Sequence, residues 1–292
     1  MIQQTLEETK ELVWPVIEKY LEDPKYPKQF EIPSQFKNEA DEFWKINRVY
    51  PERKGKYLRP TLVILIATAM GIDSKIATNV AGAMQLSEEW ILISDDIEDD
   101  SDERRGGPTL HKIYGTELAI NASDTLENIM WKMTIDCKNS EIVDEFYRIM
   151  IRTTLGQAVE QIWTNKKTKT SSDQYFFVAD SKSAYYSIAG PMRLGAILAG
   201  ATSEQLDKLT DFGLHLGRCF QLVDDILDLE QDKKEGKSTL ATDKGVEFTK
   251  KLAENEKELA RKIFDNELQF LSDEPARSKL IELIDFILER EY

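Results

Sequence analysis

Apolar residues recur at intervals of three and four along most of the chain, whereas the alternating pattern of a half-buried strand is scarce. Leu206, Leu209, Phe212, Leu216 and Phe220 show this spacing. Residues spaced in this way lie on one face of an α-helix. The pattern therefore predicts an all-α protein.

Breaks in this pattern divide the chain into predicted helices. Proline, glycine or dense charge interrupts it at residues 23–33, 104–108 and 232–236, where we expect loops. Neither a composition break nor a solenoid repeat divides the chain, so we expect residues 1–292 to form a single domain. We expect a first helix at residues 1–22, a second that opens at Pro60 and continues through 61–70, and a third that runs from Ser74 into an acidic run. Further helices are expected to begin near residues 115, 140 and 172. The last ones are expected at 203–229 and over roughly the last forty residues.

Two aspartate-rich clusters end apolar stretches of predicted helix. Their sequences are DDIED at residues 95–99, followed by Asp100, and DDILD at residues 224–228. In a helix, residues four apart stack on one face and the next residue is rotated by about 100°, so each cluster presents two stacked carboxylates with a third beside them. Such oxygen ligands suit Mg²⁺, which shares its remaining positions with waters and substrate phosphates. The two clusters together predict a magnesium-dependent clamp for a polyphosphate.

Three simpler interpretations fit less well. An acidic run is most often a solvated surface, but the apolar residues at 91–93 and 220–223 place both clusters at the ends of buried helix, where unpaired aspartates would be costly. A calcium-binding EF-hand needs a glycine sixth and a glutamate twelfth, which no starting point in the run provides. The sequence GKST at 236–239 resembles the end of a nucleotide-binding P-loop, but Gln231 stands where that loop needs its first glycine.

The composition narrows the partners and the location. Acidic residues outnumber basic ones by 53 to 38, giving a net charge of −15, which argues against nucleic acid as a partner. Two cysteines, Cys137 and Cys219, are typical of a reducing compartment, and no signal-peptide or membrane-spanning pattern is present, so we expect a cytoplasmic protein without a transmembrane segment. Two histidines argue against a zinc or histidine-based centre.

An anionic substrate in such an acidic protein needs local positive charge. Each basic residue taken alone could be ordinary surface charge, but together they could bind a polyphosphate. The candidates are Lys56 and Arg59 before an apolar helix, Arg104 and Arg105 after the first cluster, Lys182 before a helix of small residues, and Lys237 after the second cluster.

In this arrangement the chain resembles the trans-type isoprenyl diphosphate synthases, the prenyltransferases that include farnesyl and geranylgeranyl diphosphate synthases. The resemblance keeps the family's order from about residue 50 to about residue 260. A single aspartate motif would be a weak indication, whereas this ordered set is strong. The set comprises GKYLRP at 55–60, DDIED at 95–99, RRG at 104–106, PTLH at 108–111, Lys182-Ser183, FQLVDDILD at 220–228 and GKST at 236–239.

The resemblance implies an all-α fold of the isoprenoid synthase type, a large helical bundle with a central cavity, and a homodimer. It also implies that three Mg²⁺ ions bind an allylic diphosphate, with Asp96 and Asp225 as further catalytic residues. The candidate metal ligands are Asp95, Asp99, Asp224 and Asp228.

The same resemblance implies two diphosphate sites. The allylic diphosphate would ionise as its leaving pyrophosphate is stabilised, and the double bond of isopentenyl diphosphate would attack the cation in an apolar pocket. Pyrophosphate would then take up the final proton. Arg104, Lys182 and Lys237, supported by Ser183, Phe220 and Gln221, would hold the allylic diphosphate, and Lys56, Arg59 and Arg105 would bind isopentenyl diphosphate.

Some positions depart from the family pattern or bear on the product. Glu88 stands where many members have a histidine that contacts the second diphosphate, and a carboxylate there would repel it unless protonated or paired. The loop before Lys237 is shorter than usual. Trp90 and Ile91 lie about 7 Å along the helix from the metal end. They are either core residues or a floor that stops the growing prenyl chain. With an aromatic residue at this position, the chain most resembles the geranylgeranyl synthases, followed by the farnesyl synthases.

Two functions outside this reaction remain as alternatives. A non-catalytic partner subunit of a prenyltransferase heterodimer usually lacks one aspartate motif, and both are intact here. Class I terpene cyclases share the fold and the first motif but lack the pair Lys56 and Arg59 and a second DDxxD. We therefore expect a short-chain synthase that makes geranylgeranyl diphosphate, with farnesyl diphosphate as the alternative product.

Overall fold

The computed structural model describes residues 2–166, 171–235 and 238–288, and these are helical in nearly all of their length. They fall into two compact units, each described here by itself. The first-motif unit comprises Leu6–Thr61 and Thr78–Lys138, and the second-motif unit comprises Met1–Thr5, Leu62–Ala77 and Asn139–Tyr292. The predicted all-α class is confirmed, whereas the single domain over 1–292 stays a prediction.

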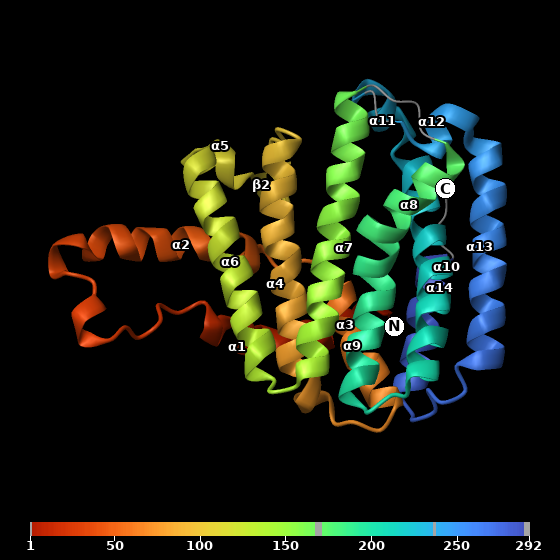
Figure 1. The fold of residues 1–292 in the computed structure, drawn as a ribbon, viewed down its shortest axis with the longest axis horizontal. Helices are drawn as coiled ribbons and strands as arrows, with labels where there is room; N and C mark the ends of the chain where they lie inside the picture. Colours follow the sequence, from red (N-terminus) through yellow and green to blue (C-terminus); the bar gives the residue numbers. More distant parts are fainter. Residues whose placement is uncertain (1, 167–170, 236–237, 289–292) are drawn as a thin grey trace. The chain divides into compact units, whose positions relative to one another are not determined.

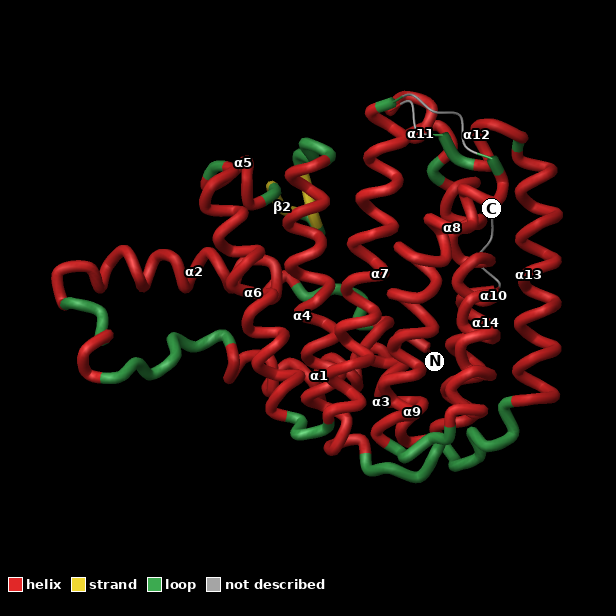
Figure 2. The backbone as a smooth tube through the Cα atoms, in the orientation of Figure 1, coloured by secondary structure: helices red, strands yellow, loops and turns green. Residues whose placement is uncertain are grey.

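The first-motif unit carries the aspartate cluster DDIED at the end of its longest helix, α4, which begins in the other unit (Figures 1 and 2). Figure 2 shows a long non-helical stretch, broken by two 3₁₀ turns, between α1 and α2. The elements are α1 (Ile2–Tyr20, apart from its first turn), η1 (Lys28–Phe30), η2 (Ser34–Phe36), α2 (Lys37–Arg53), the start of α3 (Leu58–Ala69), α4 (Ser74–Glu98), β1 (Glu103–Arg104), β2 (Gly107–Pro108), α5 (Leu110–Tyr114) and α6 (Thr116–Asp136).

Three helices of this unit meet at Gly82 of α4. A Cβ atom at this position would lie 2.6 Å from Met133 Cε of α6 and 3.2 Å from Ile17 Cγ1 of α1. Both of these side chains are buried. The absent side chain therefore allows α1 and α6 to pack closely on α4 and fixes the helix that carries the cluster.

The second-motif unit is a helical bundle in which α10 packs against both η3 and α13 (Figure 1). A Cβ atom at Gly213 or Gly217 of α10 would lie within 2.6 Å of the backbone of Ala189 or Ala184 in η3. Besides the end of α3, the elements are α7 (Ser140–Asn165), α8 (Ser172–Val178), the π-helix η3 (Ala179–Ala189), α9 (Gly190–Leu198), α10 (Ser203–Leu227), α11 (Leu229–Glu235), α12 (Leu240–Lys244), α13 (Val246–Glu267) and α14 (Ala276–Leu288).

Most helix positions predicted from the sequence are confirmed, including those that begin at Ser74, Ser140 and Ser172. Two loop predictions were wrong. Residues 104–108 contain an antiparallel strand pair, and the described part of 232–236 belongs to α11. None of the helices formed by the described residues is long and apolar enough to cross a membrane.

Candidate active site

The first aspartate cluster lies in the last turn of α4 and just beyond it. Asp96 faces the interior with 1% of its surface exposed, and its carboxylate accepts hydrogen bonds from Tyr50 Oη at 2.5 Å and from Arg104 Nε and Nη2 at 2.9 and 2.5 Å. Asp95 is half-buried and Asp99 is exposed. Asp96 is thus held towards the interior by hydrogen bonds, while Asp95 and Asp99, four residues apart, lie on a more accessible face.

The strand pair β1–β2 presents the two arginines that follow the cluster. Arg105 and Gly106 adopt left-handed backbone conformations, with φ of 52° and 74°, and turn the chain between the strands. The guanidinium group of Arg53 donates to the carbonyl oxygens of Arg104 and Gly107 at 3.0 and 3.3 Å. Arg53 therefore fixes the turn, a role that the sequence did not reveal because the partners lie more than fifty residues away.

The two arginines predicted to bind isopentenyl diphosphate face two glutamates of α4. Glu88 forms ion pairs with Arg59 Nη1 and Arg105 Nη2, both at 3.2 Å, so the carboxylate at this unusual position is paired. Glu89 is buried and accepts Arg105 Nη1 at 2.8 Å and Gln85 Nε2 at 2.7 Å. Burial raises the pKa of Glu89 to about 7, although Arg105 and Gln85 act in the opposite direction.

The second cluster, at the end of α10, has the same construction as the first. Asp225 is 5% exposed and accepts hydrogen bonds from Tyr175 Oη at 2.7 Å and Gln221 Nε2 at 2.8 Å. Burial raises the pKa of Asp225 to about 6, and these two hydrogen bonds oppose the shift. Asp224 is half-buried and Asp228 is exposed. The spacing again leaves the outer aspartates on the more accessible face.

The residues predicted to support the allylic diphosphate lie on η3 and α10. Ser183 Oγ donates to Gln221 Oε1 at 2.6 Å, so these two predicted residues are in contact. Lys182 Nζ donates to Glu160 Oε2 of α7 at 2.9 Å. The sequence did not predict this glutamate, which pairs with the ammonium group that is predicted to bind phosphate.

The remaining predicted substrate residues differ in exposure. Lys56 is exposed and Phe220 is half-buried, whereas Lys237 lies outside the described residues. Trp90 and Ile91 are both half-buried. Trp90 Nε1 is buried and has no hydrogen-bond partner among the described residues. Its role as a floor stays a prediction.

The donor set of each cluster fits Mg²⁺. Asp95 and Asp99, and likewise Asp224 and Asp228, offer carboxylate oxygens at a spacing of four, and Mg²⁺ is commonly bound through one or two carboxylates together with waters and substrate phosphates. Among the described residues, no three acidic, histidine or cysteine side chains form a group that could hold a metal ion alone. Waters and substrate phosphate oxygens would complete the coordination.

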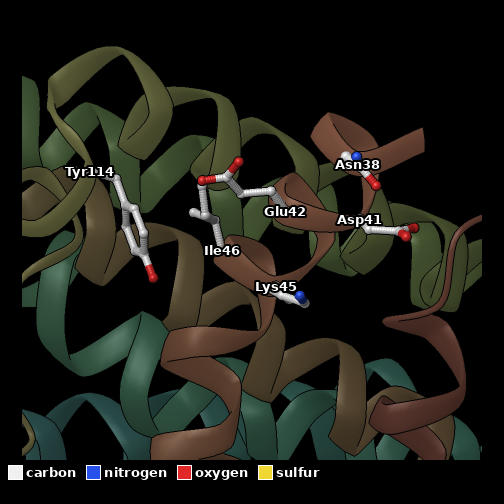
Figure 3. A pocket seen from close by; sticks show the side chains of 6 residues that line it. All are labelled: Asn38, Asp41, Glu42, Lys45, Ile46 and Tyr114. Carbon is white, nitrogen blue, oxygen red and sulfur yellow. The ribbon is translucent and has the colours of Figure 1, made fainter. Parts of the chain in front are cut away.

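A surface hollow of about 530 Å³ on the first-motif unit contains none of the predicted site residues. Figure 3 shows the ring of Tyr114 opposite side chains of α2. One lysine stands against two carboxylates there, so the hollow does not suit a polyphosphate. Its lining residues are Asn38, Asp41, Glu42, Lys45, Ile46 and Tyr114.

This all-helical fold is shared with known proteins. A geranylgeranyl pyrophosphate synthetase from the archaeon Geoglobus acetivorans has the same fold, with a TM-score of 0.83, 24% identity and 99% of each chain covered. In sequence, the chain is 30% identical to a geranylgeranyl diphosphate synthase of Methanosarcina mazei, over 86% of this chain and 91% of that one. It is 29% identical to a short chain isoprenyl diphosphate synthase of Methanothermobacter thermautotrophicus, over 82% and 87%.

The family model of the polyprenyl synthetases matches residues 41–248. The chain therefore belongs to the polyprenyl synthetase family. The predicted family, the isoprenoid synthase type of fold and the predicted enzyme class, a prenyltransferase, are confirmed. The roles predicted for individual site residues stay predictions.

Proposed function

We propose that the chain joins isopentenyl diphosphate to an allylic diphosphate and releases pyrophosphate, as a magnesium-dependent short-chain trans-prenyltransferase. The observation that carries the proposal is the shared construction of the two clusters, in which a buried tyrosine holds the middle aspartate inward. The outer aspartates of each cluster are then available to Mg²⁺. Bound Mg²⁺ would supply positive charge that stabilises the leaving pyrophosphate.

Three cations would hold the allylic diphosphate on this proposal: Arg104, Lys182 and Lys237. Arg104 hydrogen-bonds to Asp96 and Lys182 to Glu160. Each carboxylate orients its cation, and each would share that cation with the incoming diphosphate. Ser183 and Gln221 would support the same phosphate group, and their mutual contact keeps both hydroxyl and amide in fixed positions.

Isopentenyl diphosphate would be bound by Lys56, Arg59 and Arg105. Its double bond would attack the allylic cation, and pyrophosphate would remove the proton that forms the new double bond, so no protein histidine is needed. Trp90 and Ile91 would end the pocket for the growing chain, which favours geranylgeranyl diphosphate as the product. The alternative product is farnesyl diphosphate.

The second candidate function is that of a non-catalytic partner subunit. Glu88 favours it, because this carboxylate occupies two arginines that a catalytic chain needs for isopentenyl diphosphate. The intact pair of aspartate clusters favours catalysis. We also propose a homodimer and a cytoplasmic location, both as expected from the sequence.

The proposal is tested by incubating the purified chain with radiolabelled isopentenyl diphosphate and dimethylallyl, geranyl or farnesyl diphosphate, with Mg²⁺ or with a chelator. We expect incorporation that needs Mg²⁺ and that falls at least about a hundredfold in Asp95→Asn, because the charge on a transition-state group is lost. Asp100→Asn is the matched control, since Asp100 is exposed, pairs with Lys112 and lies outside the DDxxD pattern. No incorporation with any primer would favour the partner subunit.

A further inference from the structure

The cation site for the second diphosphate contains its own counter-charge. Arg59 and Arg105 bring two positive charges, and the carboxyl groups of Glu88 and Glu89 lie within 3.2 Å of them. The guanidinium group of Arg105 is divided between the two glutamates, because Nη1 contacts Glu89 and Nη2 contacts Glu88. A diphosphate would meet two arginines whose guanidinium groups are already paired with carboxyl groups.

The two glutamates hold these arginines with different strength. Glu89 has a side chain that is 1% exposed and binds Arg105 Nη1 through both of its oxygens, at 2.8 and 3.0 Å. Glu88 is 18% exposed, and each of its contacts with the arginines is longer, at 3.2 Å. Shorter charge-assisted hydrogen bonds out of water are the stronger ones. Glu88 is therefore the carboxylate that an incoming anion can replace.

The arginine cannot move away from Glu88 towards the chain segment behind it. A Cβ atom at Gly55 would lie 2.6 Å from Arg105 Nη2, so the backbone of Gly55 is packed against the nitrogen that Glu88 uses. Glu89 holds the other nitrogen from the interior. A diphosphate that contacts Arg105 Nη2 therefore competes with Glu88 for the same nitrogen.

We propose that Glu88 is an internal counter-ion that occupies Arg59 and Arg105 until a diphosphate displaces it. Glu88 thereby sets the affinity of the site for the diphosphate of the second substrate, while Glu89 stays in place and keeps Arg105 oriented. The identity of the natural ligand, isopentenyl diphosphate, rests on the proposed function. The displacement of Glu88 needs only an anion with the charge of a diphosphate, and it involves no chemical step.

The test is calorimetric titration of the full-length chain with inorganic pyrophosphate, at fixed ionic strength and with a chelator, so that metal-dependent binding is removed. Gln85 Nε2 also donates to Glu88 Oε2 at 3.1 Å. We compare the natural chain with Glu88→Gln, which keeps the size of the side chain and an acceptor for Gln85 while removing the charge. Glu52→Gln is the matched control, because Glu52 is an exposed glutamate of the same unit that pairs with Arg48. Arg59→Gln and Arg59→Lys, each made alone and together with Glu88→Gln, show whether the change in pyrophosphate affinity depends on the charge of Arg59.

Glu88→Gln is expected to bind pyrophosphate at least about tenfold more tightly, since one charge within 4 Å of the anion site is removed, and Glu52→Gln less than about twofold. The gain in pyrophosphate affinity from Glu88→Gln should disappear in the double variant with Arg59→Gln and persist in part in the double variant with Arg59→Lys. Equal affinities for Glu88→Gln and Glu52→Gln, or a full gain without Arg59, would overturn the proposal. Thermal unfolding of each variant shows that it is folded.

A kinetic measurement separates this inference from the proposed function. With turnover present, Glu88→Gln should lower the KM for isopentenyl diphosphate by a similar factor and leave the KM for the allylic primer unchanged. Tighter pyrophosphate binding in a chain that incorporates no isopentenyl diphosphate would support the counter-ion and refute the reaction. Unchanged binding and KM in an active chain would refute the counter-ion alone.

Discussion

Arg105 is predicted to bind substrate, and in the structure it also pairs with the buried carboxylate of Glu89. Replacing Arg105 tests whether this pairing stabilises the fold. In Arg105→Gln, the carboxylate of Glu89 loses two charge-assisted contacts and keeps Gln85 as a donor. Glu88 loses one contact and keeps Arg59. The perturbation therefore falls mainly on a carboxylate whose side chain is 1% exposed. We expect Arg105→Gln to destabilise the fold as well as to weaken substrate binding.

The expected magnitude follows from the burial of Glu89. Removing one partner of a buried ion pair lowers the free energy of unfolding by about 3–5 kcal/mol, because the other charge is left without compensation. The carboxyl group can avoid part of this loss by taking up a proton, and its pKa is already about 7 with Arg105 in place. Loss of Arg105 raises that pKa further, so the destabilisation should be larger at pH 8 than at pH 5.

The assay is denaturant unfolding of the natural chain, Arg105→Gln, Glu89→Gln and the double variant at both pH values. The double variant replaces the charged pair with two neutral amides, so it should recover at least about half of the stability lost at pH 8. A loss below about 1 kcal/mol in Arg105→Gln at pH 8 would refute the reasoning. A double variant no more stable than Arg105→Gln would refute it too.

Three further predictions follow from single side chains. Tyr175→Phe removes the hydroxyl donor of Asp225 and should lower the free energy of unfolding by about 2 kcal/mol in urea; a loss no larger than that of exposed Tyr147→Phe would contradict it. Trp90→Ala should lengthen the prenyl product, and chromatography that shows an unchanged chain would rule out the floor. Folded Glu89 binds its proton more tightly than the unfolded chain, so its contribution to stability is lost as the pH rises from about 4.5 to about 7. Glu89→Gln should flatten the unfolding free energy across that window, and an unaltered pH profile would contradict the assignment.

Local pattern was sufficient to predict most helices, because the signals that begin a helix lie within a few residues. Thr202 and Gln205 form a capping box at the start of α10, with the bonds that such a spacing predicts. The charged segment after the second cluster was wrongly predicted to be a loop, because its dense charge was taken as a break in the helical pattern. Glu230 lies in the first turn of α11 and pairs with Lys233 at 2.9 Å. Charges in this order stabilise a helix rather than end it.

The partners of the site residues could not be predicted, because they come from distant parts of the chain. Tyr50 is 46 residues from Asp96, and Tyr175 is 50 residues from Asp225. No local spacing connects a tyrosine to a particular aspartate across such distances. The sequence indicated that Glu88 would have to be protonated or paired, but the arginines that pair with it became evident only from the fold.

The two clusters share a construction and differ in one electrostatic respect. A middle aspartate turned towards the interior must accept hydrogen bonds, and a tyrosine supplies one without adding charge near the metal ligands. Asp96 has the positive charge of Arg104 as a second partner, whereas Asp225 has the neutral amide of Gln221. Arg104 is also a predicted diphosphate ligand, so substrate binding and the anchoring of Asp96 draw on one guanidinium group. At the second cluster, Gln221 links Asp225 to Ser183 and is itself predicted to support the diphosphate, so a neutral amide is shared there in place of a guanidinium group.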